Sequence, residues 1–452
     1  MTVKVCLVLD NPLRDLDGLI LLAWQLAARG AEAYLIGMYE QAADVAQIGA
    51  DVVVANYVRA NNRDLLAAYR RRGLRTVVLD TEGAPGNSSD MLADSVRRQR
   101  ASNLVDEYLV WGSDQRATFV RSGAMPANRV HATGCPRFDF CADPWRRTLD
   151  CPQGVEPGYV LVNTNFPIVH PRFSGSVAHE VAGAVAVGYE AGFVDRYVVE
   201  ARRAHAAMLE CVAALSRRLP NVRFVVRPHP FECAEPYRRL ESAGNVHVRQ
   251  DGTAIQWLHY AAALVHLNCS TALEAVMLDR EPLCPEWINS EDLYLDGPTR
   301  VSRRTPNLSA LAESLEALAV GHSLGRDPSL DAARTDLIER LYLAADGRAA
   351  ARAAERILAA EEAPSAADPA PAPSLRGRAT FALNTMLGYR AAETVRAFAG
   401  GGRAARRAAK AFRIETVRGL VSRLDHVAGV SRSTDVALVA GWRGSGRAVR
   451  VS

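Results

Sequence analysis

The stretch VKVCLVLDNPLRDLDGLILLAWQLAARGAEAYLIGM, residues 3–38, decides the fold class. It begins with a short β-rich run, continues with an amphipathic stretch of helical length that closes on Gly30, and returns to a second β-rich run. Two strands joined by a helix form a right-handed βαβ unit with parallel strands. The alternation continues to about residue 140, so residues 1–150 are predicted to form a Rossmann-like α/β domain.

A second series of the same kind follows the turn-rich stretch at 143–158. YVLVNTNF at 159–166 and NVRFVVRPHP at 221–230 predict strands, and a long helix is expected across roughly 190–218. Residues 151–359 are therefore predicted to form a second Rossmann-like α/β domain. Because open α/β sheets bind ligands at the carboxyl ends of their strands, we expect the two domains to face a shared cleft.

Length and composition exclude several classes of protein. The chain has 452 residues, of which 49% are hydrophobic and 23% charged, so wholesale disorder, collagen and coiled coil are excluded. No run of about eighteen apolar residues occurs, and the N-terminus lacks the features of a signal peptide, so a cytoplasmic location is expected. The eight cysteines form no CxxC pair and have no zinc-type spacing. No metal is predicted.

The C-terminal part of the chain differs in composition from the rest. Residues 360–374, AEEAPSAADPAPAPS, are expected to be an Ala/Pro linker. Residues 375–452 carry a net charge of +11 against −7 for the remainder, and this basic tail is expected to be helical or disordered. A nucleic-acid enzyme would carry its basic surface along the main binding groove, so nucleic acid is not expected as a partner.

Within the tail, residues 401–424 can form a basic amphipathic helix. Its apolar residues that can share one face are Phe412, Ile414, Val417, Leu420 and Val421. Such a helix could attract an anionic membrane surface. A solvated basic tail or a self-association helix explains the same pattern equally well.

The motif RPHP at 227–230 ends a predicted strand. Arg227 offers a planar fork for a phosphate or carboxylate, His229 adds a further donor, and Pro228 and Pro230 fix the turn. We therefore predict that this strand end binds an anion. The alternative is a plain turn with a surface arginine and a buried histidine.

The stretch LVHLNCSTALEA at 264–275 reads as a buried strand, a polar turn and the start of a helix. Free N–H groups at that helix start, with Asn268 and the hydroxyls of Ser270 and Thr271, are predicted to bind a nucleotide phosphate. Glu274 could accept hydrogen bonds from a ribose. The same pattern also fits a capping box, and capping and phosphate binding can coexist.

In the first domain, NPLRDLDG at 11–18 joins a predicted strand to a helix. Arg14, Asp15 and Asp17 bring one cation and two carboxylates to this junction, where they could perform acid/base chemistry or bind sugar hydroxyls. The alternative is that one aspartate caps the helix while Arg14 pairs with the other.

A third group of carboxylates follows another predicted strand in LDTEG at 79–83. Because the carboxyl ends of parallel strands align, Asp80 and Glu82 are expected near Asp15 and Asp17. Converging carboxylates suit glycosyl chemistry, although a solvated acidic loop explains them too. Further cleft candidates are Gly83, Arg137, Asn163 and Asn165.

Six motifs occur here in the order found in a known family. RDLDG, LDTEG, WGSDQ with TGCPRFD, VNTNF, RPHPFE and HLNCSTALEA resemble those of the bacterial surface carbohydrate biosynthesis protein family. That family is similar to capsule Kdo transferases and to CDP-glycerol glycerophosphotransferases, which share the two-domain GT-B fold. The resemblance covers about residues 1–300 and has no counterpart for the tail beyond residue 360.

The resemblance implies a metal-independent GT-B glycosyltransferase that uses a nucleotide sugar as donor and a glycan or lipid-linked molecule as acceptor. It places the nucleotide phosphate on His229, Pro230, Ser270 and Thr271. It makes Asp15, Asp17 and Glu82 the catalytic candidates. Two alternatives remain open: a UDP-sugar 2-epimerase-like enzyme of the same fold, and a non-catalytic scaffold for glycan assembly.

Overall fold

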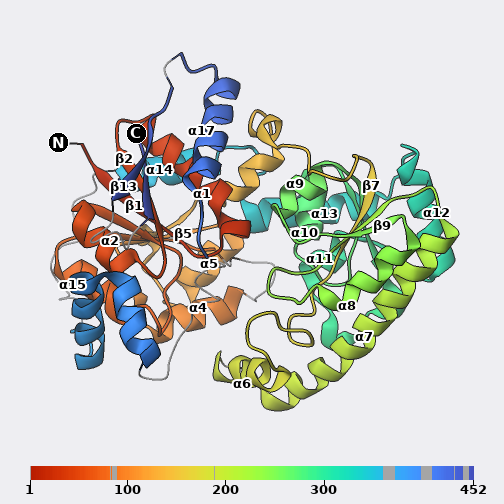
Figure 1. The fold of residues 1–452 in the computed structure, drawn as a ribbon, viewed down its shortest axis with the longest axis horizontal. Coiled ribbons are helices and arrows are strands. Elements are labelled where there is room, and N and C mark those ends of the chain that lie inside the picture. Colours follow the sequence, from red (N-terminus) through yellow and green to blue (C-terminus); the bar gives the residue numbers. More distant parts are fainter. Residues whose placement is uncertain are drawn as a thin grey trace. The chain divides into compact units, whose positions relative to one another are not determined.

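The computed structural model describes residues 2–81, 83, 89–187, 189–359, 372–398, 410–431, 433–440 and 447–452. The chain divides into two compact units (Figure 1). The first unit comprises Met1–Thr148 and Glu339–Ser452, and the second comprises Leu149–Ile338. Each unit is built on one sheet, and the α/β fold class predicted from the sequence is confirmed in both.

The first sheet has the strand order β13-β14-β2-β1-β3-β4-β5-β6. Its parallel strands are β1 (Lys4–Leu9), β2 (Glu32–Gly37), β3 (Val52–Ala55), β4 (Arg75–Leu79), β5 (Glu107–Val110) and β6 (Val130–Ala132). The strands are buried on both faces, as expected of a parallel sheet covered by helices.

Helices cover both faces of this sheet. One face packs against α2 (Gln41–Ile48), α3 (Arg63–Arg71), α4 (Ser89–Arg98) and α5 (Ser113–Arg121). On the other face, α1 (Pro12–Ala27) packs against β1 and β2. Asn11 caps α1 by accepting a hydrogen bond from the Leu13 N–H at 3.0 Å, and Pro12 occupies the first helical position, where a missing N–H costs nothing.

The second sheet has the strand order β12-β11-β10-β7-β8-β9 and is parallel throughout. Its strands are β7 (Tyr159–Asn163), β8 (Phe224–Arg227), β9 (Val246–Val248), β10 (Ala261–Val265), β11 (Glu281–Pro285) and β12 (Arg303–Thr305). Its helices are α6 (Val177–Val187), α7 (Ala191–Arg218), α8 (Glu235–Arg238), α9 (Ala254–His259), α10 (Thr271–Met277), α11 (Asp296–Arg300) and α12 (Leu308–Ala319). α7 and α12 pack on one face and close the core.

The boundary between the units differs from the one expected at 151–359. The helix α13 (Pro328–Tyr342) passes from the second unit into the first, and α14 (Ala349–Leu358) packs against α1. Asp139 fixes α14 in the first unit, because its carboxylate accepts hydrogen bonds from the N–H groups of Ala349 at 2.9 Å and Ala350 at 2.8 Å. The Asp139 contact spans 210 residues of the chain, so no local pattern in the sequence indicates it.

The tail belongs to the first unit. Its helices are α15 (Leu375–Phe398) and α17 (Ile414–Ala428), and its strands β13 (Val436–Ala440) and β14 (Arg447–Val451) extend the first sheet, with β14 antiparallel to β2. These two strands were not predicted. The predicted linker lies largely outside the described residues, as do residues 401–409 of the predicted amphipathic helix.

The apolar face of α17 is turned into the protein. Val417, Leu420 and Val421 are buried, and α17 packs against α1. The Trp24 indole N–H donates to Asp425 Oδ1 at 2.7 Å and fastens the two helices. This face is therefore occupied by the first unit itself, contrary to the expectation that it could meet a membrane surface.

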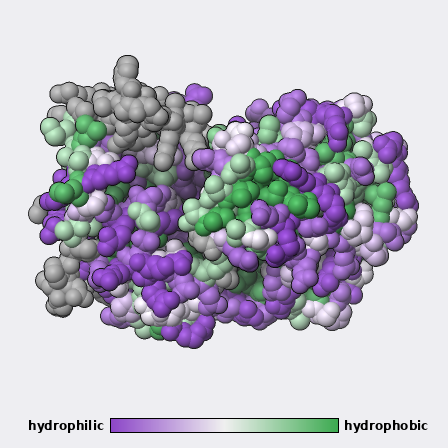
Figure 2. Space-filling model, turned by 90° about the horizontal axis from the view of Figure 1, so that it is seen from below, coloured by the Kyte–Doolittle hydropathy of each residue, from purple (hydrophilic) through white to green (hydrophobic). Residues whose placement is uncertain are grey.

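Apolar surface is instead exposed over the second unit, in the region of α6 (Figure 2). Ala182, Val185 and Ala186 of this helix are exposed, Val185 to 40%. Among the helices that the structure describes, none combines the length and the hydropathy that crossing a membrane requires.

Candidate functional site

The carboxyl edge of the second sheet brings together residues from three of the predicted motifs. Asn163 ends β7 and Arg227 ends β8, and the two are partners in the register of these strands. Thr271 begins α10, and its hydroxyl accepts a hydrogen bond from Asn163 Nδ2 at 2.9 Å. Asn163 is 5% exposed, and its Oδ1 is buried without a hydrogen-bond partner.

Arg227 is buried and turned toward a neighbouring loop. Its Nη2 donates to the carbonyl of Asp251 at 2.9 Å and to that of Gly252, while its Nε is buried without a partner. Burial lowers the pKa of Arg227 to about 10, against the opposite effect of the Asp251 and Glu274 carboxylates. Arg227 therefore holds the loop at Asp251 and Gly252 against this edge of the sheet, and the surface arginine of the alternative interpretation is not what the structure has.

His229 lies half-buried in the loop that follows β8. Its Nδ1 accepts a hydrogen bond from the Phe231 N–H at 3.2 Å, and its ring stacks on that of Phe231 at 5.7 Å between centroids. This contact leaves the proton of the neutral ring on Nε2. Gln250 fastens the loop by donating to the carbonyls of His229 at 2.8 Å and Glu232 at 2.7 Å, and half-buried Pro230 lies between them.

Glu232 is a residue that the sequence analysis missed. Its carboxylate is fully buried, and Oε2 accepts hydrogen bonds from Thr164 Oγ1 at 2.8 Å, Phe166 N at 3.1 Å and His229 N at 3.3 Å. Tyr237 donates its hydroxyl proton to Oε1. Burial raises the pKa of Glu232, against the effect of these hydrogen bonds. The only sequence signal was its place in RPHPFE, five residues after Arg227.

The turn before α10 is held by groups beneath it. His266 Nδ1 accepts the Cys269 N–H at 3.3 Å, and its Nε2 lies 2.7 Å from Ser302 Oγ, which donates to the Pro298 carbonyl. Asn268 is buried and donates to the Leu293 carbonyl at 3.2 Å.

The capping box considered for this turn does not form. Ser270 occupies the N-cap position of α10 in a helical backbone conformation, without a capping hydrogen bond from its side chain. Glu274 is buried in the first turn, close enough to influence the charge of Arg227. Ser270 and half-buried Asn165 complete the group of predicted residues at this edge.

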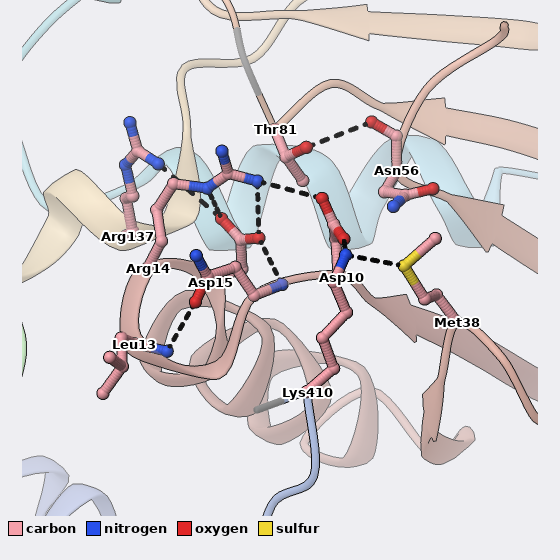
Figure 3. Close-up of polar contacts among 10 residues, drawn as sticks. Asp10, Leu13, Arg14, Asp15, Met38, Asn56, Thr81, Arg137 and Lys410 are labelled. Atoms are coloured by element: carbon pink, nitrogen blue, oxygen red, sulfur yellow. Dashed lines mark hydrogen bonds and ion pairs between the residues drawn. The ribbon is translucent and has the colours of Figure 1, made fainter. Parts of the chain in front are cut away.

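In the first unit, the predicted residues gather where β1 meets α1 (Figure 3). Arg14 donates to both oxygens of Asp15, from Nε at 2.7 Å and from Nη2 at 3.0 Å, and Nη2 lies 3.4 Å from Asp10 Oδ2. Asp15 also accepts the Asn11 N–H at 3.2 Å and lies 3.6 Å from Arg137 Nη1. The Asp15 carboxylate is thus fully engaged in holding Arg14, Arg137 and the start of the helix.

Close approach of two segments positions Arg137. A Cβ added to Gly18 would lie 2.6 Å from the Arg137 backbone nitrogen, so only glycine fits at this place in α1. The Arg137 guanidinium lies over the rings of Trp111 at 4.9 Å and Phe138 at 4.6 Å, and its Nε and Nη1 are buried without a hydrogen-bond partner.

The remaining carboxylates are less closely tied to this cluster. Asp17 lies in the second turn of α1 and is half-buried. Asp80 is buried after β4 and accepts the Tyr108 hydroxyl proton at 2.5 Å. Glu82 lies outside the described residues. Gly83 packs against Trp111, because a Cβ there would lie 2.5 Å from the indole.

Two residues of this cluster were missed from the sequence. Asp10 directly follows β1, and its position at a strand end was an available signal. Lys410 forms an ion pair with Asp10 from the tail, 400 residues away, and nothing local in the sequence indicates this contact. Within the part of the chain that the structure describes, no three His, Cys, Asp or Glu side chains gather so as to hold a metal ion.

No family model and no curated protein sequence matches this chain. Several solved structures align with it at low identity. That of S. aureus MnaA with UDP is 10% identical with a TM-score of 0.48, over 79% of this chain and 96% of that one. The Methanocaldococcus jannaschii UDP-GlcNAc 2-epimerase with UDP-GlcNAc and UDP is 10% identical with a TM-score of 0.47, over 79% and 99%. The wall teichoic acid polymerase TagF H548A is 11% identical with a TM-score of 0.48, over 78% and 88%.

Proposed function

We propose that this chain is a GT-B-type glycosyltransferase of surface-carbohydrate biosynthesis, which moves a sugar from a CMP- or UDP-linked donor to a glycan or lipid-linked acceptor in the cytoplasm. The observation that carries the proposal is the carboxyl edge of the second sheet. Asn163, Arg227 and Thr271 meet there, and Asn163 Oδ1 and Arg227 Nε are buried without partners. A polar ligand would supply what these atoms lack, and each unpaired buried group costs about 1–3 kcal/mol.

The chemistry around this edge suits a nucleotide diphosphate or monophosphate. Arg227 supplies a buried positive charge, His229 a ring N–H and Ser270 a hydroxyl group. The Thr271 hydroxyl accepts from Asn163 and donates to Cys269 Sγ at 3.0 Å, so it holds the turn beside these donors. Such donors stabilise the negative charge that develops on the phosphate as the bond to the sugar breaks. A fixed set of donors performs this task without a metal ion.

The proposal assigns the acceptor to the first unit. Asp15 is a positioning residue, because both of its oxygens already accept hydrogen bonds from Arg14 and the Asn11 N–H. Asp10, whose two oxygens pair with Arg14 and Lys410, is a second positioning residue. Asp17 and Glu82 remain the proposed catalytic carboxylates. One of them would deprotonate the acceptor hydroxyl or form a covalent glycosyl intermediate.

The same phosphate-binding edge would serve a UDP-sugar 2-epimerase, which needs only one sugar substrate. Incubation of the full chain with UDP- and CMP-sugars, with and without a lipid-linked acceptor extract, separates the two enzymes. A transferase releases nucleotide only when the acceptor is present. An epimerised nucleotide sugar formed from the donor alone would contradict the transferase, and folded protein without either product would favour the scaffold.

A further inference from the structure

Lys410 reaches the candidate site of the first unit from the far end of the chain (Figure 3). Its ammonium pairs with Asp10 Oδ1, lies 3.0 Å from Met38 Sδ and lies 5.6 Å from the centroid of the Tyr39 ring. Asp10 follows β1 and Met38 follows β2. Lys410 therefore lies at the carboxyl edge of the first sheet, where parallel α/β sheets hold their ligands.

The structure around α17 fixes the segment that carries Lys410. α17 begins at Ile414, and the Asp425 carboxylate on this helix is bonded to the Trp24 indole of α1. Phe412, two residues after the lysine, is buried, with 8% of its surface exposed. Beyond α17, β14 pairs with β2, with Arg450 opposite Tyr34. The lysine is thus held against the sheet by packing that follows it in the chain.

Cations and carboxylates meet in this cluster. Lys410 and Arg14 both pair with Asp10, and Arg14 and Arg137 both pair with Asp15. A lysine ammonium has three N–H donors. Here it meets one carboxylate oxygen, a thioether sulfur, which is a weak acceptor, and the face of a tyrosine ring. The ammonium can therefore donate to an oxygen of a bound ligand.

The identity of the residue is itself unusual in this chain. Of the 54 lysines and arginines, only Lys4 and Lys410 are lysines. An ammonium is a compact point charge with rotatable donors, whereas a guanidinium is a larger planar fork. Lys410 thus adds to the two arginines of the cluster a cation of a different shape.

We propose that the C-terminal segment completes the binding site of the first unit, and that Lys410 binds a phosphate or carboxylate group of the molecule held there. An anion beside Lys410 would accept the hydrogen bonds that the ammonium can still donate. The inference rests on the proposed function only in taking this molecule to be the acceptor, which would then be acidic.

The small number of lysines makes a direct test possible. Selective 13Cε-lysine labelling of the full chain gives two signals, and Lys410→Arg assigns them. Inorganic phosphate, pyrophosphate and glucuronate are titrated separately at constant ionic strength. We expect a saturable shift of the Lys410 signal, while Lys4, which donates to the Ile48 carbonyl at 3.3 Å, stays unmoved. A response to glucuronate alone identifies a carboxylate ligand, and a response to the phosphates alone a phosphate.

A Lys410 signal that no anion moves, or that moves in parallel with the Lys4 signal, would overturn the inference. Calorimetry with the anion that gives a shift provides the second readout, in a His229→Ala background so that the second unit does not contribute. Lys410→Ala should weaken binding about tenfold or more, and Lys410→Arg, which keeps the charge but not the shape of the cation, should weaken it by a smaller factor. Equal affinity of Lys410→Ala and the parent, with the helix content unchanged, would also overturn it.

Arg413→Ala is the matched control. It removes the same charge from the same segment, but Arg413 is 79% exposed and pairs with Glu415, so anion binding should not change. Nucleotide binding by the second unit is measured independently in the same variants. A protein that binds nucleotides but no anion at Lys410 would refute this inference and leave the proposed function standing. A protein that binds an anion at Lys410 but no nucleotide would support this inference and contradict the proposed function.

Discussion

Asn163 and Thr271, 108 residues apart in the chain, are joined by a hydrogen bond of 2.9 Å from Asn163 Nδ2 to Thr271 Oγ1. The bond links the end of β7 to the start of α10, beside the end of β8. It brings three separate sequence motifs to one edge of the second sheet. The proposed nucleotide site lies at this edge.

Arg227 should be important for stability as well as for ligand binding. Arg227→Met removes the donor shared by the Asp251 and Gly252 carbonyls and takes the positive charge away from buried Glu274. The free energy of unfolding measured in urea should therefore decrease by about 2 kcal/mol. Arg223→Met is the control, because the Arg223 side chain is 41% exposed and pairs with exposed Glu156. This variant should lower the free energy of unfolding by less than about 0.5 kcal/mol. Equal losses in the two variants would contradict the role of Arg227 in holding the Asp251 and Gly252 carbonyls.

Glu232 should tolerate glutamine but not alanine. In Glu232→Gln the amide oxygen can accept the three hydrogen bonds now made to Oε2, and the amide N–H can donate to the Tyr237 hydroxyl, so the loss should be about 1 kcal/mol or less. Glu232→Ala leaves these donors buried and unpaired and should cost about 3 kcal/mol or more.

Thermal or urea unfolding of both Glu232 variants measures this difference. Glu235→Ala changes an exposed carboxylate three residues later, at the start of α8, and should shift stability by less than about 0.5 kcal/mol. If Glu232→Gln proved as damaging as Glu232→Ala, the hydrogen-bonding role of this carboxylate would have to be abandoned.

Two glycines inside helices should respond to alanine with opposite signs. Gly18→Ala places a Cβ 2.6 Å from the Arg137 backbone nitrogen, so α1 or the turn at Arg137 must move, at a cost of about 1–3 kcal/mol. In α17, a Cβ on Gly419 would meet only Arg423 Nη1 at 3.7 Å, so Gly419→Ala should stabilise by about 0.5–1 kcal/mol. Denaturant midpoints measure both, and a shared sign would contradict the close approach at Gly18.

His266 should make the second unit sensitive to acid. Burial lowers the pKa of His266 to about 3 from its ordinary value of 6.5. As the pH falls from 7 to 5, His266 therefore becomes protonated in the unfolded chain but stays neutral in the folded chain. This difference should lower the free energy of unfolding by about 2 kcal/mol. Protonation would also place a hydrogen on Nδ1 facing the Cys269 N–H.

His266→Leu tests this assignment. The variant should be less stable at pH 7, because Ser302 and the Cys269 N–H lose their partner, but its stability should decrease less between pH 7 and pH 5. His322→Asn, which changes an exposed histidine, should retain the pH dependence of the parent. An identical slope for the parent and His266→Leu would show that another group titrates.

The sequence predicts the two sheets because most of their strands and helices have local signals, namely β-rich runs, helical periodicity and glycines at helix ends. β13 and β14 escape prediction because their pairing is nonlocal: β14 joins β2 across about 400 residues, with Val449 opposite Leu35. The boundary between the two units differs from the predicted one for the same reason. The N-terminus of α14 is bonded to Asp139 of the first unit, 210 residues earlier in the chain.

The candidate site residues also fall into those that local sequence signals predict and those that depend on contacts remote in the chain. Asn163, Arg227 and Thr271 were predictable because strand ends in a parallel sheet align. The direction of Arg227 was not, because it depends on carbonyls at Asp251 and Gly252. Glu232 and Lys410 act through partners remote in the chain, Thr164 for the first and Asp10 for the second.

The most direct test of the central claim is nucleotide binding at the edge of the second sheet. Calorimetry and thermal shifts with CMP, CDP, UMP, UDP and GDP compare the full-length parent with His229→Ala, and with Arg223→Met as a control remote from the edge. The account predicts selective binding of a cytidine or uridine nucleotide, weakened about tenfold or more in His229→Ala and unchanged in Arg223→Met. Folded protein that binds none of the five, or binds them equally well without His229, would contradict it.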